Sequence, residues 1–191
     1  QTRVRQKEKE IQLLQSRKIT YPRAVEEALA AIRKGCPQAD PRVLCDYVEV
    51  TEPLWQMAIE GYIGGARFSI LVEPEYEAEA IRIVRLMAGA RRNGARVIQG
   101  RKAQRDAERT ALPPESIINF MVFSHKTAEH YLRASYGNVV GVPDADALRD
   151  TARGVTPDGL GSGGYTMWRC DLDDSELVFG QAARERALRA K

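Results

Sequence analysis

The sequence has few of the features that mark a secreted, membrane-spanning or zinc-stabilised protein. Its 191 residues include only three cysteines, none in a C-x-x-C pair, so neither a disulfide framework nor a zinc ribbon is indicated. The best candidate for an apolar run, residues 68–72, is far shorter than the ~18 residues of a membrane span. No signal-peptide pattern opens the chain. We therefore expect a cytoplasmic protein that neither spans nor crosses a membrane.

Common motifs of catalysis are also missing. No G-x-x-x-x-G-K-[ST] occurs, so no P-loop is indicated. The only two histidines, His125 and His130, are five residues apart and would point to different faces of a helix, unlike a zinc-binding pair. Neither histidine has a neighbouring cysteine nucleophile, and Ser162 lacks the G-x-S-x-G frame. We expect no catalytic residue, no metal and no cofactor in this chain.

Aromatic residues and net charge are both low. Aromatics make up 7% of the chain, and 29 Lys and Arg stand against 26 Asp and Glu, for a net charge of +3. A hydrophobic fraction of 43% is typical of soluble globular proteins, and a chain of this length can bury one sizeable core or two small ones. The net charge is too small to indicate a nucleic-acid partner, so the distribution of charge along the chain is the more informative property.

Hydrophobic periodicity predicts alternating strands and helices in the first half of the chain. After Tyr21-Pro22, apolar residues recur at helical spacing, and stretches rich in Val, Ile and Leu separate the helices. The predicted helices cover residues 23–34, 53–63 and 75–87, and the predicted strands cover residues 43–50, 67–73 and 95–99. This β-α-β-α-β order after the first helix is typical of right-handed parallel crossovers.

A polar, charged stretch over residues 100–114 interrupts this pattern, and we interpret it as a loop between two halves. The second half repeats the alternation more weakly, without a demonstrable sequence repeat. Residues 116–123 fit a strand or a buried helix start, and Ser124 can cap the next helix. Further predictions are a strand at 139–142, a helix from Asp144 to Gly154, a glycine-rich loop at 155–164 and a strand at 165–169.

Both ends of the chain are rich in helix formers. Val4, Ile11 and Leu14 have the a and d spacing of a coiled coil, although a solvated helix with one apolar edge fits equally well. We expect an α/β protein with two mixed subdomains on an antiparallel helical stalk. The expected parts are a coiled-coil stump at 1–20, subdomains at 21–110 and 111–176, and a returning coiled-coil stump at 177–191.

A glycine motif and an acidic cluster are weak candidates for ligand sites. The run from Gly159 to Gly164 is a literal G-x-G-x-x-G, which would bind a pyrophosphate only between a strand and a helix. Its flanking residues fit neither element, so a loop is the better interpretation. A small α/β enzyme or nucleotide-binding domain that uses this run is the alternative function. Asp171, Asp173 and Asp174 could hold a hard cation but are more typical of a solvated loop.

Basic residues concentrate between Arg91 and Arg109. Seven Lys and Arg stand against two acids there, whereas the rest of the chain carries a net negative charge. A flexible basic loop of this kind could neutralise DNA phosphates. Because no aromatic residue is interleaved to stack bases, a solvated loop is the alternative. The candidate DNA-binding residues are Arg91, Arg92, Arg96, Arg101, Lys102, Arg105 and Arg109.

Two runs resemble the hinge domain of structural-maintenance-of-chromosomes (SMC) ATPases. They are LCDYVEV at residues 44–50 and WQMAIEGYIGGARFSILV at residues 55–72. The Tyr21-Pro22 entry and the later VTPDG at residues 155–159, with Gly-Tyr-Thr after it, look similar to the same group. The resemblance covers residues 21–169, and it is closest to the divergent condensin-like subunits of bacterial Wadjet and Mks-type systems.

The resemblance implies a homodimerising hinge at the tip of a long antiparallel coiled coil, often in contact with DNA. The parent would be a nucleoid-associated ATPase of chromosome organisation or plasmid defence, with ATP and Mg²⁺ bound by heads outside this chain and with kleisin-type and accessory subunits. SMC hinges use glycines where backbones approach across the dimer, although Gly64-Gly65 also fits a helix C-cap. The implied interface residues are Gly64, Gly65, Gly159, Gly161, Gly163 and Gly164.

Overall fold

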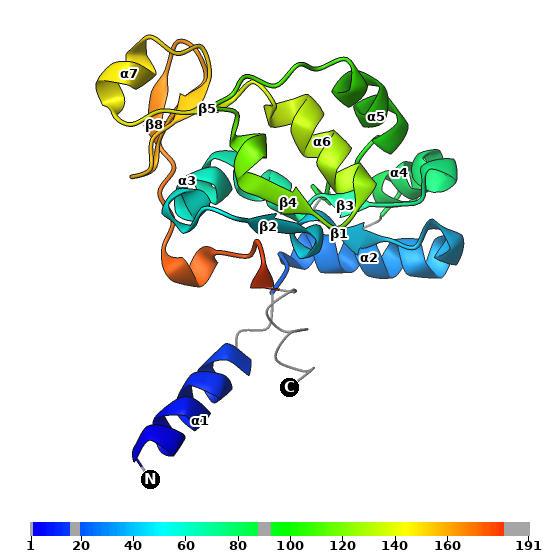
Figure 1. The fold of residues 1–191 in the computed structure, drawn as a ribbon. Helices are drawn as coiled ribbons and strands as arrows, with labels where there is room; N and C mark the ends of the chain where they lie inside the picture. Colours follow the sequence, from blue (N-terminus) through cyan, green and yellow to red (C-terminus); the bar gives the residue numbers. More distant parts are fainter. Residues whose placement is uncertain (1, 16–19, 88–92, 182–191) are drawn as a thin grey trace.

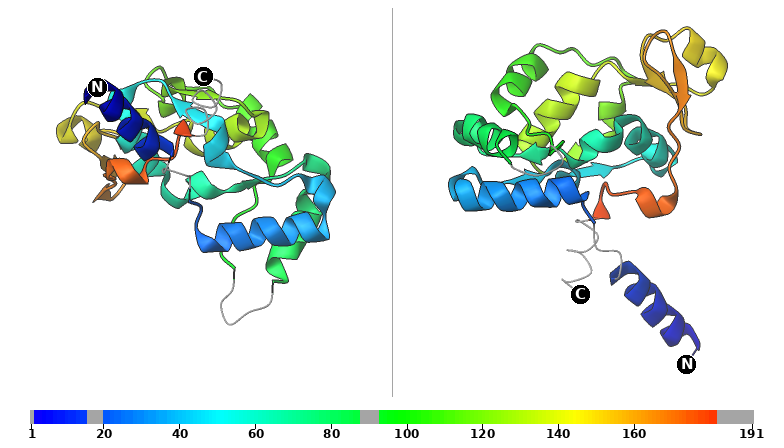
Figure 2. Two further views of the ribbon diagram at one scale, coloured as in Figure 1. Left: turned by 90° about the horizontal axis from the view of Figure 1, so that it is seen from below. Right: turned by 180° about the vertical axis from the view of Figure 1, so that it is seen from behind.

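The computed structural model describes residues 2–15, 20–87 and 93–181. Helix α1 (Thr2–Gln15) lies apart from the remainder, in which helices surround short strands (Figure 1). Helix α2 (Arg23–Gly35) lies on one side of strands β1 to β4, and α6 (Lys126–Tyr136) lies on the other (Figures 1 and 2). In the described ranges no helix is long and apolar enough to cross a membrane.

Helix α2 follows the sequence prediction closely. It begins after Pro22, which fixes a backbone angle suited to a helix start. Its apolar stripe is buried, as its 3.6-residue spacing predicts, and it packs against α4 (Glu77–Arg85). The buried residues of the stripe are Val25, Ala28, Leu29 and Ile32.

The first of the predicted parallel crossovers, from residues 43–50 to 67–73, is wrong, because the strands in these two segments pair antiparallel. Strand β1 (Arg42–Val43) pairs with β3 (Ile70–Leu71), and β2 (Val48–Val50) pairs with β4 (Met121–Phe123), both antiparallel. The second predicted crossover, from residues 67–73 to 95–99, is confirmed in direction, because Ile70 forms a parallel bridge with Val97 and helix α4 lies between them in the chain. The pattern of strands and helices fixes neither the direction nor the partner of strands this short.

The predicted strand over residues 43–50 is divided in two. A 3-10 turn, Leu44–Tyr47, separates β1 from β2, and it buries Leu44 and Cys45 completely. The Val and Leu enrichment of this stretch reflects burial rather than a continuous extended conformation, since apolar runs alone do not distinguish the two.

The second half contains a four-stranded sheet in the order β5-β6-β7-β8. Helix α7 (Ala145–Arg149) connects the parallel pair β5 and β6, and the remaining pairs are antiparallel. The Asp144 carboxylate accepts a hydrogen bond from the Ala147 N–H at 2.9 Å, which confirms the predicted cap. The helix ends at Arg149, before the predicted Gly154. The strands are β5 (Val140–Gly141), β6 (Gly154–Val155), β7 (Leu160–Ser162) and β8 (Met167–Arg169).

The predicted loop at residues 100–114 is wrong over its first nine residues. These form helix α5 (Gly100–Glu108), which packs on α6. The contact face consists of Gly100, Ala103 and Ala107, which are buried, whereas the charged residues of the helix are exposed. Small residues permit close helix packing but give a weak hydrophobic signal, and this is why the charge pattern hid the helix.

Helix α6 and the 3-10 turn before β4 begin with side-chain caps. Nδ1 of His125 accepts from the Thr127 N–H at 3.1 Å, so His125 caps α6 and the predicted cap, Ser124, does not. The predicted strand or helix start at 116–123 contains both kinds of element. A 3-10 turn, Ile117–Phe120, is capped by Ser116, and it leads into β4.

The described residues from both halves form one connected hydrophobic core. Strands β2 and β4 pair although they lie on opposite sides of the predicted boundary at residue 110. The division into two subdomains stays a prediction, as does the antiparallel stalk. Residues 177–180 are not helical, and the predicted C-terminal helix beyond Gln181 lies outside the described residues.

Candidate dimer interface and nucleic-acid interface

The turn at Gly64 and Gly65 ends helix α3 (Pro53–Ile63). Gly64 has a φ of 61°, which favours glycine, and its N–H donates to the Glu60 carbonyl. The predicted C-cap is therefore confirmed. A Cβ added at Gly64 or Gly65 would meet no described atom within 4 Å. The described chain leaves room for a second backbone at this turn.

Two residues that flank this turn, Glu60 and Arg67, form a buried ion pair. The Arg67 guanidinium donates to the Glu60 carboxylate at 2.9 Å, and the two side chains are 8% and 0% exposed. Arg67 also donates through Nε to the Gly64 carbonyl at 2.8 Å. Because this ion pair is desolvated, its contribution to the stability of the fold depends on all of its hydrogen bonds being made.

The same ion pair holds the segment that leaves the body toward the C-terminus. Oε1 of Glu60 accepts from the N–H groups of Val178 and Phe179 at 2.7 Å and 3.2 Å. Arg67 donates to the Glu176 carbonyl at 3.0 Å. This cluster was not predicted from the sequence. Its one visible signal is a glutamate among the apolar residues of a helix, between Ile59 and Ile63.

Gly161 and Gly163 make room for an aromatic side chain of their own chain. A Cβ would lie 3.2 Å from the Trp168 ring at Gly161 and 3.3 Å from it at Gly163. Tyr62 of α3 contacts the same ring, with centroids 5.5 Å apart, and donates from its hydroxyl to the Ser162 carbonyl at 3.0 Å. These two glycines therefore have a packing role within the protomer, whether or not a partner also contacts them.

Gly159 and Gly164 both have positive φ angles, 88° and 110°. A Cβ at Gly159 would lie 2.7 to 2.9 Å from Asp171, so that position is closed. At Gly164 the nearest described atom would be the Ala152 carbonyl oxygen at 3.6 Å, so that position is open. Among the six predicted interface glycines, Gly64, Gly65 and Gly164 have space beside them.

The G-x-G-x-x-G run is part of a β-hairpin and does not open a helix. Residues 160–162 are strand β7, and residues 167–169 are strand β8. The predicted loop at 155–164 is thus wrong for β7, while β8 confirms the strand predicted at 165–169. A dinucleotide cradle needs a helix N-terminus after the glycines, so the geometry on which the alternative function depends is not present.

One closely packed glycine was not predicted from the sequence. A Cβ on Gly61 of α3 would lie 1.6 Å from the carbonyl oxygen of Cys170, which follows β8. Helix α3 and the hairpin therefore touch backbone to backbone. As Gly61 and Tyr62 contact the hairpin and Gly64 ends the same helix, α3 connects the two glycine segments that the resemblance assigned to one interface.

Strand β8 is an edge of its sheet in the described part of the chain. It and the preceding loop expose apolar side chains, with Met167 and Trp168 40% and 39% accessible and Tyr165 fully exposed. Exposed aromatic residues beside an unpaired edge are uncommon on a monomer surface, because both favour association.

The hydrogen bonds between β7 and β8 show which backbone groups of β8 face outward. The Cys170 N–H donates to the Gly159 carbonyl at 2.8 Å, and the Thr166 carbonyl accepts from the Gly163 N–H at 3.3 Å. Because antiparallel bonding alternates along a strand, the N–H and C=O groups of Met167 point away from β7. They are available to another strand.

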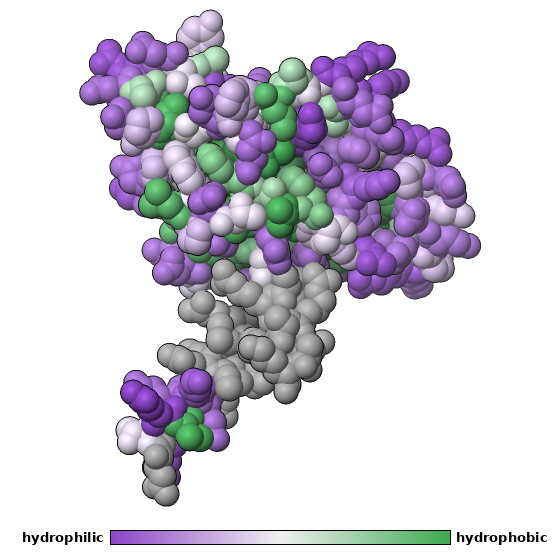
Figure 3. Space-filling view, in the orientation of Figure 1, coloured by the Kyte–Doolittle hydropathy of each residue, from purple (hydrophilic) through white to green (hydrophobic). Residues whose placement is uncertain are grey.

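The basic residues lie mainly on a rigid helix rather than on a flexible loop. Arg101, Lys102 and Arg105 are exposed on α5, and Arg109 follows at its C-cap. Arg96 is exposed beside β3, whereas Arg91 and Arg92 lie outside the described residues. The face that carries α5 and α4 is hydrophilic in Figure 3. The helix holds the cations in a fixed array.

Asp171, Asp173 and His125 have structural partners. Asp171 forms an ion pair with Arg169 at 2.9 Å, and this hydrogen-bonded contact lowers the pKa of Asp171. Asp173 forms a capping box with Glu176. The His125 ring packs edge-on against Tyr47, and burial lowers its pKa. Within the described ranges no group of side chains is arranged to hold a metal ion.

Neither a family model nor a curated protein matches the sequence. Solved structures do match the fold. The Pyrococcus furiosus SMC hinge domain aligns over 85% of this chain and 91% of its own, with 18% identity and a TM-score of 0.59. The chain has the fold of an SMC hinge domain.

Further hinge structures agree with this assignment of the fold. An asymmetric dimer of the Geobacillus stearothermophilus SMC hinge domain aligns over 97% of this chain and 79% of its own, with 19% identity and a TM-score of 0.64. The S. pombe Smc5/6 hinge domain aligns over 82% and 69%, with 13% identity and a TM-score of 0.51. The hinge fold predicted from the resemblance is thus confirmed.

Proposed function

We propose that this chain is a non-catalytic hinge that joins two copies of an SMC-like ATPase. The observation that carries the proposal is the unpaired edge of β8, with exposed Tyr165, Met167 and Trp168. It lies on the hairpin contacted by α3, the helix that ends at the open Gly64-Gly65 turn. The hinge fold supports the proposal, since one similar hinge domain was solved as a dimer.

The dimer contact would combine strand addition with apolar burial. A strand of the partner would bond to the outward N–H and C=O of Met167, and the exposed aromatic side chains would be covered. Gly64, Gly65 and Gly164 would allow the partner backbone to approach. Gly159, Gly161 and Gly163 would act indirectly, by shaping the hairpin that presents the edge.

A pair of variants at Met167 tests the edge. M167P removes the outward N–H, which an edge strand tolerates, and M167A shortens the same side chain but keeps that N–H. We expect M167P to lower the mass measured by light scattering from twice 21.3 kDa toward 21.3 kDa, and M167A to stay dimeric. Equal dimerisation of both variants, with unchanged thermal unfolding, would exclude the β8 edge as the contact.

We also propose that the parent is a condensin-like subunit of the Wadjet or Mks type. It would bind ATP and Mg²⁺ in its heads, assemble with kleisin-type and accessory subunits, and act in the nucleoid. Support comes from the sequence runs at residues 44–50 and 55–72 and from the hinge fold. Copurification of the full-length parent with its genomic neighbours tests this, because a parent without ATPase heads or a kleisin-type partner would contradict it.

DNA contact is the second part of the proposed function, and α5 is the element that favours it. Its exposed cations, Arg101, Lys102 and Arg105, sit on a helix anchored by buried alanines. A fixed array of this kind can neutralise phosphates without reading sequence. The proposed surface also includes Arg91, Arg92, Arg96 and Arg109.

A matched pair of quadruple variants tests the DNA surface. The first replaces Arg101, Lys102, Arg105 and Arg109 by Ala, and the control replaces Arg23, Arg33, Lys34 and Arg85, which are exposed on α2 and α4. We expect only the first to weaken the gel shift of a DNA duplex and to reduce the slope of log affinity against log salt by about 3.6. Equal losses from both variants would contradict a localised surface.

A further inference from the structure

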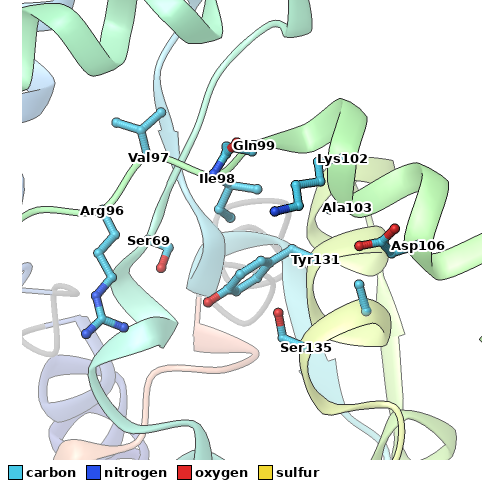
Figure 4. Close-up of a pocket in the computed structure, with 11 residues that line it drawn as sticks. Ser69, Arg96, Val97, Ile98, Gln99, Lys102, Ala103, Asp106, Tyr131 and Ser135 are labelled. Carbon is cyan, nitrogen blue, oxygen red and sulfur yellow. The ribbon is translucent and has the colours of Figure 1, made fainter.

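A pocket of about 320 Å³ lies between helices α5 and α6 and the segment 96–99 (Figure 4). Its volume is within the range of small-molecule sites, which start at about 300 Å³. The apolar part of its wall includes Val97, Ile98 and Ala103. The proposed dimer contact does not use this pocket, which shares Arg96 and Lys102 with the proposed DNA surface.

The pocket wall is fixed by the backbone. The Ile70 N–H donates to the Arg96 carbonyl at 2.8 Å, and the Ile98 N–H donates to the Ile70 carbonyl at 2.9 Å. The opposite wall is the packed pair α5 and α6, whose contact is buried. The polar side chains of the pocket therefore project from a scaffold that exists before any ligand binds.

Donor groups predominate in the pocket. The side chains of Lys102, Tyr131 and Ser135 point into a common space in Figure 4, with the hydroxyl of buried Ser69 and the Arg96 guanidinium along one edge. Within the part of the chain that the structure describes, none of these five makes a side-chain hydrogen bond or ion pair with the protein.

One acid faces this array. Asp106 lies one turn after Lys102 on α5 and points into the same space (Figure 4). Two cations against one carboxylate leave a net positive pocket. The donors outnumber what a carboxylate ligand could accept, whereas a phosphate group offers three or more acceptor oxygens. Asp106 can accept from a hydroxyl or amino group on the same ligand.

We propose that this pocket binds the phosphate of a nucleotide, either free or as one unit of a DNA strand. The phosphate would contact Lys102 and the hydroxyls of the pocket, and Arg96 at the opposite edge would add positive charge (Figure 4). The sugar or base would lie against the Tyr131 ring and Asp106. This binding does not depend on dimerisation. It shares Arg96 and Lys102 with the proposed DNA surface but uses none of the other cations of that surface, so it can fail while both of those proposals hold.

The test is an amide-shift titration of the ¹⁵N-labelled chain by NMR. The probes are dTMP, inorganic phosphate, thymidine and a 5′-phosphorylated oligothymidine. We expect dTMP to shift the amides of Gln99, Lys102 and Ser135, and thymidine to shift none of them, because it lacks the phosphate. Binding of dTMP alone would identify a free nucleotide as the ligand, and equal shifts with the oligonucleotide would identify a DNA strand.

Variants separate the pocket from general charge attraction. K102M should weaken dTMP binding by about tenfold or more, as expected for a lost bond to a charged group. K34M, which removes the same charge from the exposed end of α2, should weaken it by less than twofold. S135L should abolish binding by filling the pocket, and Y131F, which keeps the fold, should weaken it. Equal effects of K102M and K34M, or no shift with dTMP or phosphate, would overturn the proposal.

Discussion

Replacing Glu60 by Gln tests the buried cluster that joins α3 to the C-terminal segment. The amide keeps the shape of the side chain and can still accept from the Val178 N–H. The Arg67 charge, however, loses its carboxylate while its side chain remains only 8% exposed. Breaking one partner of a buried pair costs about 3–5 kcal/mol, which is a large share of a typical total of about 5–15 kcal/mol.

The assay is urea unfolding followed by the fluorescence of Trp55 and Trp168. For a chain of this size, we expect a parallel fall in melting temperature of about 6–20 °C. The matched control is E27Q, which removes a carboxylate from the exposed pair with Arg23, whose side chains are 92% and 51% accessible. Such pairs contribute about 0–1 kcal/mol, so E27Q should unfold almost as the unmodified chain does.

A double variant completes the test. E60M combined with R67M removes both charges, so it should recover part of the stability lost in E60Q, because no unpaired charge remains buried. The reasoning is refuted if E60Q lowers the free energy of unfolding by less than about 1 kcal/mol. It is also refuted if the double variant is less stable than E60Q.

Three further predictions concern packing, protonation and thiol reactivity. G61A should destabilise the chain by about 3 kcal/mol or more, since its Cβ would overlap the Cys170 carbonyl oxygen. G65A, with open space around it, should change stability by less than about 0.5 kcal/mol. Similar unfolding of the two variants would contradict the close packing of Gly61 on Cys170. Burial and the charge of Arg42 lower the pKa of His125 below its ordinary 6.5, so the unfolded chain binds this proton more readily and the free energy of unfolding should fall as the pH drops from about 7 to 5. H125N, whose amide oxygen can still cap α6, should lose part of this dependence, and an unchanged pH profile would exclude His125 as its source. All three cysteines are buried, and burial raises the pKa of Cys45 above its ordinary value and that of Cys170 to about 11; Ellman's reagent at about pH 8 should modify no thiol until the chain is denatured, and rapid modification of the folded chain would contradict the buried positions.

Helices with large apolar side chains could be predicted from the sequence, and α5 could not. Val25, Leu29 and Ile32 give α2 a periodic stripe that burial then confirms. The anchors of α5 are Ala103 and Ala107, whose burial carries little hydrophobic signal beside the charges around them. Helix propensity alone is too weak to decide such a segment.

Strand pairing and close approaches depend on distant parts of the chain, so local patterns missed them. The partner of β2 is β4, more than 70 residues later, and each strand has only three residues. Glu60 and Gly61 acquire their roles from residues at 170 and beyond. The glycines at 64–65 and 159–164 could be singled out from the sequence, but only the geometry separates the open positions from those packed on Trp168 or Asp171.

The central claim is that two copies of this chain associate, and its most direct test is the solution mass by light scattering over a concentration series. Because the proposed contact buries a strand edge and aromatic side chains rather than exposed ion pairs, we predict a mass of twice 21.3 kDa at both low and high salt. A mass of 21.3 kDa at every concentration would contradict the proposed hinge dimer.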